Sequence, residues 1–271
     1  MQHQDTQPDA IVSSQLPSRH GLVVVAAPKE WEAVAPVLGF NPDSPKIGEV
    51  SRSTSGSHQW DLMRCGVGKT QAGLLTFRAL NEYGHARVIS LGIAGALSGP
   101  DGAPSLDIGT VVVSSQCLFA DEGVQAPDRF IPMSELGFGI EDPHNKQSPP
   151  HTIEAAPHDP NASKALLDQL VERSAQPDSM ISCAVSAPVA TVSICAGTDE
   201  LASTRAQYSG AACEAMEGAA VVLAAHWLRV SAVEVRVISN TTGDRNHQRW
   251  DLNLAMDVLA EVASVVASLP Q

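Results

Sequence analysis

The chain has 271 residues, of which 44% are hydrophobic and 4% aromatic, which is enough apolar content for one large domain or two small ones. Its net charge of −13, without a Lys- or Arg-rich stripe, argues against nucleic acid and anionic membranes as partners. No apolar stretch reaches the roughly 18 residues of a membrane span. Five irregularly spaced cysteines without a CxxC pair argue against disulfides or a zinc site. We interpret them as small buried hydrophobes of a cytoplasmic protein.

Residues 1–20 are polar and lack the pattern of a signal peptide, so we expect a disordered tail followed by a single domain over residues 21–271. The run LVVVAA at 22–27 is typical of a buried strand, and a helix is expected over 29–38. The chain should then hold a loop or irregular hairpin at 41–58, a strand at 60–65, a helix from 66 to 83, a strand over 86–97 ending in a glycine-rich turn, and a strand at 110–120.

The proline-rich stretch 139–161 is expected to form an extended surface loop, and its irregularly spaced histidines predict no metal site. After it we expect a helix at 163–174, strands near 181–185 and 188–195, a helix capped by Thr198 or Asp199, a short strand at 211–215, a helix at 217–228, a strand at 231–240 and a helix at 251–268. The alternation of strands and helices predicts one α/β domain with a largely parallel sheet.

Ligands of such sheets bind beyond the carboxyl ends of the strands. Five segments place glycine or polar residues there: PKE at 28–30, CGVGKT at 65–70, SLGIAGA at 90–96, EAMEGAA at 214–220 and RVISNTTGD at 236–244. Each also has a purely structural interpretation. Gly66 and Gly68 could only shape a tight turn, and Glu30 stands in a helix first turn, where a carboxylate is favoured anyway. Glu217 begins an apolar helix, where a buried carboxylate is costly unless it has partners.

Together these segments resemble the nucleoside phosphorylase/nucleosidase superfamily over residues 22–265. The stretches FADEG at 119–123, SELGF at 134–138 and RVISNTTGDRNHQRWDL at 236–252 resemble the futalosine hydrolase family within it. The resemblance implies a three-layer α/β sandwich whose mixed, largely parallel central sheet is flanked by helices, with no cofactor and no metal. It implies hydrolysis of futalosine, a 5′-modified inosine, to hypoxanthine and dehypoxanthine futalosine in menaquinone biosynthesis.

The resemblance also implies roles for residues. Glu30 would be the base that activates water. Met216 would lie beneath the ribose, and Glu217 would bind the ribose 2′- and 3′-hydroxyls. The purine would pack near a turn without bulky side chains, formed by Gly92, Ile93, Ala94 and Gly95. Arg236 and Ser239 would hold the acidic residues in position. Asp121 stands where the family keeps an acidic residue, without an assigned role.

Asn240 stands where adenine-specific relatives carry Asp. Hypoxanthine offers two acceptors, O6 and N7, and both N–H groups of an Asn amide could serve them, so Asn240 favours a 6-oxopurine. Related phosphorylases hold phosphate near the glycine-rich turn, where this chain has Ser90 and Ile93. Because Ile cannot donate to phosphate and Glu30 would repel an anion, water is the expected nucleophile.

Three alternatives remain open: a methylthioadenosine/S-adenosylhomocysteine nucleosidase, which Asn240 disfavours; a purine nucleoside phosphorylase, which would require phosphate; and a non-catalytic relative, which retention of Glu30 and Glu217 disfavours. The expected partner is a small-molecule nucleoside. The resemblance further implies a homodimer or higher homo-oligomer, for which apolar residues near Phe119 and Phe130 are the only hint in the sequence.

Overall fold

The computed structural model describes residues 20–53, 59–99, 105–140, 155–156 and 158–270. Its strands are β1 (Gly21–Val25), β2 (Val50–Ser51), β3 (Trp60–Arg64), β4 (Arg87–Ala96), β5 (Val111–Phe119), β6 (Gly123–Gln125), β7 (Phe130–Pro132), β8 (Ala155–Ala156), β9 (Ala184–Thr191), β10 (Cys213–Ala215) and β11 (Ser231–Thr241). Its helices are α1 (Pro28–Val34), α2 (Lys69–Tyr83), α3 (Pro160–Ser174), α4 (Asp199–Ser209), α5 (Gly218–Trp227) and α6 (Leu252–Ser268). All of the tail expected at 1–20 except residue 20, and most of the loop expected at 139–161, lie outside the described residues.

One mixed sheet has the strand order β10-β9-β5-β11-β4-β1-β3-β2, with β8 paired to β5. The central strand β4 runs parallel to β1 and β11, whereas β5 is antiparallel to β11. At its end β4 also pairs antiparallel with β10, through Cys213 opposite Ala96 and Glu214 opposite Gly95. Strands β10, β9, β5, β11 and β4 therefore close into a ring. This closure brings β10 and the start of α5 beside the glycine-containing end of β4.

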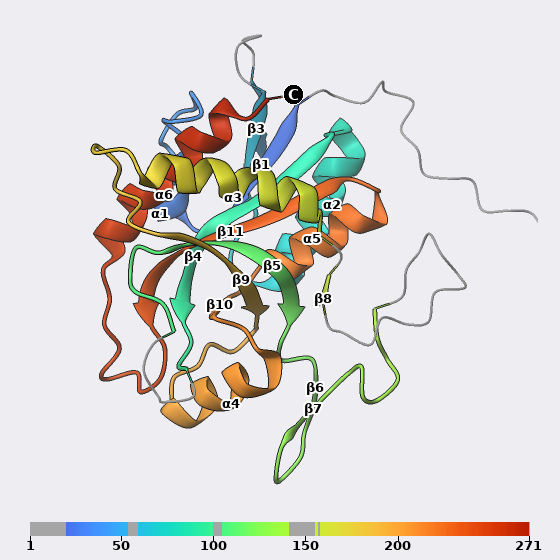
Figure 1. Ribbon diagram of the computed structural model, residues 1–271. Helices are drawn as coiled ribbons and strands as arrows, with labels where there is room; N and C mark the ends of the chain where they lie inside the picture. The colour runs from blue at the N-terminus through green and yellow to red at the C-terminus, as the bar shows by residue number, and fades with distance from the viewer. Residues whose placement is uncertain (1–19, 54–58, 100–104, 141–154, 157, 271) are drawn as a thin grey trace, which may run out of the picture.

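Helices cover both faces of this sheet (Figure 1). On one face α1, α3 and α6 pack through an apolar cluster that includes Trp31 and Leu259. On the other face α2 and α5 pack through a cluster that includes Leu80 and Val222. Helix α4 lies beyond the carboxyl ends of β4 and β11 (Figure 1). The predicted α/β sandwich is confirmed, and no helix within the described ranges is long and apolar enough to cross a membrane.

Several predicted boundaries are wrong. The LGIAG stretch is not a turn, because β4 stays paired with β11 and then β10 up to Ala96. The two strands expected between 181 and 195 are the single strand β9. It passes through Pro188 where its register with β5 shifts, and such a bulge tolerates proline. Helix α1 ends at Val34 because Pro36 cannot donate a helical hydrogen bond. The β6–β7 hairpin was not predicted.

The interpretation of all five cysteines as buried hydrophobes holds for three of them. Cys65, Cys117 and Cys213 are buried, but Cys183 and Cys195 are exposed. The two exposed residues lie just outside the ends of β9, where the chain enters and leaves the sheet.

Candidate active site

Glu30 lies in the first turn of α1, directly after β1, and is buried. Its carboxylate accepts three backbone hydrogen bonds. Oε2 accepts from the N–H groups of Ala26 (2.9 Å) and Ala27 (2.8 Å), and Oε1 accepts from the N–H of Ile93 (2.9 Å). The first two bonds satisfy donors at the start of the helix, as the structural interpretation of Glu30 requires. The third bond goes further, because it fastens the carboxylate to β4 in the segment predicted to face the purine.

Glu217 lies between β10 and α5 and is also buried. Its Oε1 accepts a hydrogen bond from the N–H of Gly68 (3.0 Å), at the start of α2, and its Oε2 lies 3.8 Å from Nη2 of Arg236. Burial raises the pKa of Glu217 above its usual value; Arg236 opposes that rise and Glu30 adds to it. Glu30 and Glu217 therefore lie close enough for each charge to affect the other.

Arg236 is the fully buried cation between these carboxylates. Its Nε donates to Glu234 (2.9 Å) and its Nη2 donates to the Ser90 hydroxyl (3.0 Å). Burial by itself lowers the pKa of Arg236, but Glu234, Glu217 and Glu30 together raise it above its usual value. One permanently charged side chain on β11 thus compensates three buried carboxylates, which would otherwise be costly to desolvate.

Arg236 and the carboxylates of Glu30, Glu217 and Glu234 form a charged cluster. Two glycines make room for it. A Cβ at Gly92 would overlap the Arg236 guanidinium and lie 2.5 Å from Oε1 of Glu30. A Cβ at Gly218 would overlap the carboxylate of Glu234. Both glycines are therefore required by close approach of charged side chains, not by a turn.

Asn240 lies near the end of β11, just after a register shift against β4. Its Oδ1 accepts from the Ser239 hydroxyl (2.8 Å), and its Nδ2 donates to the carbonyl of Thr241 (2.9 Å). The Ser239 hydroxyl also lies 3.2 Å from the carbonyl of Ala94. The amide therefore offers one free N–H, not the two that the sequence suggested. Arg236 and Ser239 were both predicted to hold the acidic side chains in position. Arg236 contacts carboxylates, whereas Ser239 contacts Asn240.

A cavity of about 390 Å³ opens beside Asn240 and is lined by Gly95, Cys195, Ala196, Gly197, Glu214, Asn240, Thr242, Arg245, Gln248 and Trp250. Of the predicted site residues, Asn240 and Gly95 line this cavity. Glu30 and Glu217 belong to the charged cluster, and Glu30 binds the N–H of Ile93, two residues before Gly95. Met216 is half-buried at the junction of β10 and α5 and does not line the cavity.

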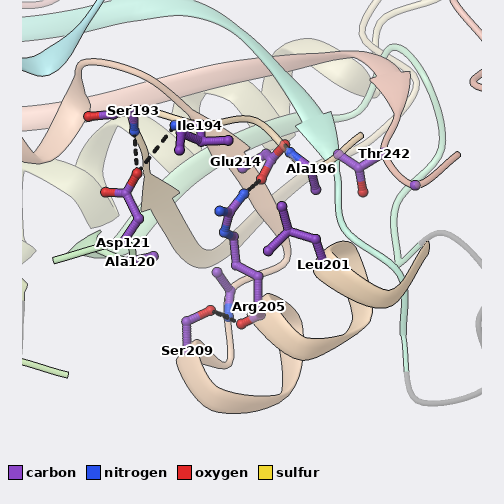
Figure 2. Close-up of polar contacts among 12 residues, drawn as sticks. Ala120, Asp121, Ser193, Ile194, Ala196, Leu201, Arg205, Ser209, Glu214 and Thr242 are labelled. Carbon is purple, nitrogen blue, oxygen red and sulfur yellow. Dashed lines mark hydrogen bonds and ion pairs between the residues drawn. The ribbon is translucent and has the colours of Figure 1, made fainter. Parts of the chain in front are cut away.

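Asp121, which the sequence left without a role, connects two segments near this cavity. Its Oδ1 accepts from Nζ of Lys69 (2.6 Å), and its Oδ2 accepts from the N–H groups of Ser193 (2.5 Å) and Ile194 (3.3 Å), as Figure 2 shows for the latter pair. Burial raises the pKa of Asp121, but these donors outweigh it and leave the pKa below its usual value. Asp121 therefore holds the turn that leads from β9 into the cavity wall at Ala196.

Sequence reasoning missed two buried charged groups. The first is Glu234. The apolar run SAVEVRVI contains two opposite charges two residues apart, and in a strand this spacing places Glu234 and Arg236 on the same face. That pattern could have revealed the buried ion pair. The second is the pair of Glu214 and Arg205, both buried. No local pattern marks Arg205, since it lies in a polar helix whose contact with β10 depends on the tertiary fold.

Comparison with known proteins identifies the family and the fold. Residues 22–269 match the family described as the phosphorylase superfamily. The chain is 31% identical to a futalosine hydrolase of Streptomyces coelicolor over 257 residues, which cover 92% of this chain and 95% of that one. Two solved structures share the fold. The futalosine hydrolase of Helicobacter pylori has a TM-score of 0.68 and 16% identity, covering 93% of this chain and 99% of that one. A methylthioadenosine/S-adenosylhomocysteine nucleosidase of Neisseria meningitidis has a TM-score of 0.66 and 17% identity, covering 93% and 100%.

Proposed function

Because the chain belongs to the phosphorylase superfamily and, within it, to the futalosine hydrolases, we propose that it hydrolyses the N-ribosidic bond of futalosine. The products are hypoxanthine and dehypoxanthine futalosine, in the menaquinone route that the family resemblance implies. One observation supports the proposal: three predicted residues surround one end of β4. Glu30 binds the N–H of Ile93 and Asn240 is paired opposite Gly95. Arg236, which packs against Gly92, lies 3.8 Å from Glu217.

In this mechanism Glu30 takes a proton from the water that attacks the anomeric carbon. Its three backbone donors fix the carboxylate in one orientation. Glu217 accepts hydrogen bonds from the ribose 2′- and 3′-hydroxyls and stabilises the positive charge that develops on the sugar. Asn240 donates its free N–H to the leaving purine, whose electron density rises as the bond breaks. Residues 21–271 act as the single catalytic domain.

Two features support water over phosphate as the nucleophile. Ser90, at one of the two positions where related phosphorylases hold phosphate, is buried and accepts a hydrogen bond from Arg236. The N–H of Ile93, at the other position, donates to Glu30. Both groups are thus engaged in the charged cluster, and a phosphate there would meet the carboxylate of Glu30.

A side-by-side assay of futalosine, methylthioadenosine and inosine, with and without phosphate, tests this function. We expect hypoxanthine release from futalosine at a rate that does not depend on phosphate. Strict dependence on phosphate would identify a phosphorylase. Adenine release from methylthioadenosine at a rate comparable with futalosine cleavage would favour the methylthioadenosine nucleosidase instead.

A homo-oligomer in the cytoplasm is part of the proposal. A groove of about 400 Å³ between α2 and α5 is lined by apolar side chains that include Phe77, Leu223 and Trp227. Leu74, on the same helix α2, is 67% exposed. Exposed apolar surface of this kind is typical of subunit interfaces, so the second copy would cover the groove beside Lys69.

A further inference from the structure

A second cavity, of about 150 Å³, lies at the end of the sheet opposite the candidate active site. It is found at the amino ends of β3, β4 and β11, beside α3 and the segment that follows α6. Its walls are mostly apolar and include Trp60, Leu166 and Leu269. An apolar cavity of about this volume holds a molecule the size of benzene. The proposed hydrolysis uses none of the residues that line it.

The register of four strands places Arg87 beside Trp60 at this cavity. Gly21 of β1 lies opposite Trp60 of β3 and opposite Arg87 of β4. Ser231 of β11 lies opposite Arg87 on its other side. Neighbours across a sheet project to the same face. A Cβ at Gly21 would lie 2.3 Å from the Trp60 ring, so only glycine lets the indole lie across β1. There the ring contacts the Arg87 guanidinium, whose central carbon is 4.3 Å from the ring centroid.

The guanidinium of Arg87 is held in place by two neutral acceptors. Its Nη1 donates to the carbonyl of Pro270 (2.6 Å), and its Nη2 donates to the side-chain oxygen of Gln59 (3.3 Å). A guanidinium carries more N–H groups than these two bonds use, so donors remain for a ligand. The neutral acceptors orient the group but leave its positive charge uncompensated.

Arg87 has no carboxylate partner within the described part of the chain. Burial lowers its pKa, and no acidic group among these residues opposes that effect. Burial also lowers the pKa of Arg205 and of Arg236, but their glutamate partners outweigh it and leave both pKa values raised. The chain has 30 acidic residues against 17 lysines and arginines, so a lack of acidic residues does not explain this difference. Because a desolvated cation is costly unless it is paired, the cavity favours an anionic ligand.

Asp159 lies behind the same wall, but its carboxylate is used elsewhere. Its Oδ2 accepts from the Ser231 hydroxyl (2.6 Å), and its Oδ1 accepts from the N–H groups of Asn161 and Ala162 (3.0 Å each) at the start of α3. Asp159 does not line the cavity and is not among the groups that shift the pKa of Arg87. The negative charge that would pair with Arg87 therefore has to come from a ligand.

We propose that this cavity binds a small monocarboxylate with an apolar body. The carboxylate pairs with the planar guanidinium of Arg87, whose geometry matches it, and the body packs against Trp60 and Leu166. A strongly hydrated inorganic anion does not suit these apolar walls, and the volume limits the body to about one benzene ring. The inference is independent of the proposed function, because this cavity lies at the amino ends of the strands and the candidate active site at their carboxyl ends.

Benzoate is the probe for this site, and benzamide is its neutral counterpart of the same shape. Ligand-observed NMR titrations on the full chain measure the affinity of each. We expect Arg87→Met to bind benzoate at least about ten-fold more weakly than the wild type does, the size expected for a hydrogen bond between charged groups. Arg87→Lys keeps the charge but loses the planar fork, so its loss should be smaller. The weaker affinity for benzamide should change little in either variant.

A second variant locates the site without changing any charge. Ala165 lines the cavity from α3 and is exposed, so Ala165→Phe should fill the cavity and leave the fold intact. We expect it to weaken benzoate binding at least about ten-fold as well. Arg64→Met is the matched control: Arg64 of β3 also donates to a proline carbonyl, that of Pro45 (2.7 Å), but does not line the cavity. It should bind benzoate as the wild type does.

Two results would overturn the proposal. The first is a wild type that does not bind benzoate at about 10 mM, a concentration at which even a weak site is occupied. The second is benzoate binding that is unchanged in Arg87→Met or in Ala165→Phe, with both variants folded by circular dichroism, since the carboxylate or the body would then be bound elsewhere.

Discussion

Glu30 is bound by three backbone N–H groups, so replacing it tests the chemistry of one oriented carboxylate. We expect Glu30→Gln to lower kcat by about 10²- to 10⁴-fold, because an amide cannot take a proton from water. The dissociation constant of the substrate should change little. Steady-state kinetics and calorimetry with futalosine provide the measurement.

Glu32 offers a matched control two residues away, since it is exposed on the same helix α1. Glu32→Gln should retain full activity. Equal turnover of the Glu30 variant and the wild type would contradict the assignment of Glu30 as base, whatever the fate of the remaining site.

Glu217 must be ionised to accept hydrogen bonds from two hydroxyls, so activity should be lost as the pH falls through its pKa. Burial and Glu30 raise that pKa, and Arg236 lowers it. Arg236→Met removes the lowering contribution, so we expect the acid limb of kcat/KM to move to higher pH. Arg236→Lys keeps the positive charge and should show a smaller shift. An acid limb in the same place for both variants, with both folded by circular dichroism, would argue against Glu217 as the titrating group.

At the scale of elements, β4 acts as the scaffold that the charged cluster and Asn240 share. Gly92→Ala would push a methyl group against the Arg236 guanidinium and Glu30. The backbone at Gly92 is held by its pairing with Arg236 of β11, so a retreat would disturb that pairing. We expect kcat to fall at least about ten-fold, in line with the sensitivity of catalysis to small displacements. A Gly92→Ala protein with wild-type kcat would show that the cluster tolerates the displacement.

The sequence predicts those parts of the fold that depend on local pattern. The β-branched runs of β1 and β11 and the apolar stripe of α6 are found close to their predicted bounds, and Thr198 caps α4 as expected. The positions of Glu30 and Asn240 follow from the rule that sites lie at strand carboxyl ends. The short strand at 211–215 was predicted, but its closure onto β4 could not be, because pairing between strands far apart in the sequence leaves no local periodic signal. The contact between Glu214 and Arg205 depends on that closure and was missed with it.

At the scale of the whole molecule, the ring of strands and the helices around it divide the surface into two regions. The cavity beside Asn240 lies at the carboxyl ends of β4 and β11, and the charged cluster adjoins it where Glu30 binds Ile93. The apolar groove is lined by α2 and α5. The two regions meet at the start of α2, where Gly68 binds Glu217 and the next residue, Lys69, lines the groove. A subunit covering the groove would therefore contact Lys69, which directly follows in sequence the Gly68 that binds Glu217.

Trp227 is the residue whose replacement tests this proposed interface, since it is 50% exposed at the end of α5 and lines the groove. We expect the wild type to have at least twice the chain mass of 28.4 kDa in light scattering. Trp227→Glu should shift the protein toward monomers, because a carboxylate buried in an apolar contact lacks a partner. Val171 on α3 is 48% exposed outside the groove, so Val171→Glu should leave the mass unchanged. A wild type that is monomeric, or a Trp227→Glu protein with unaltered mass, would place the subunit contact elsewhere or remove it.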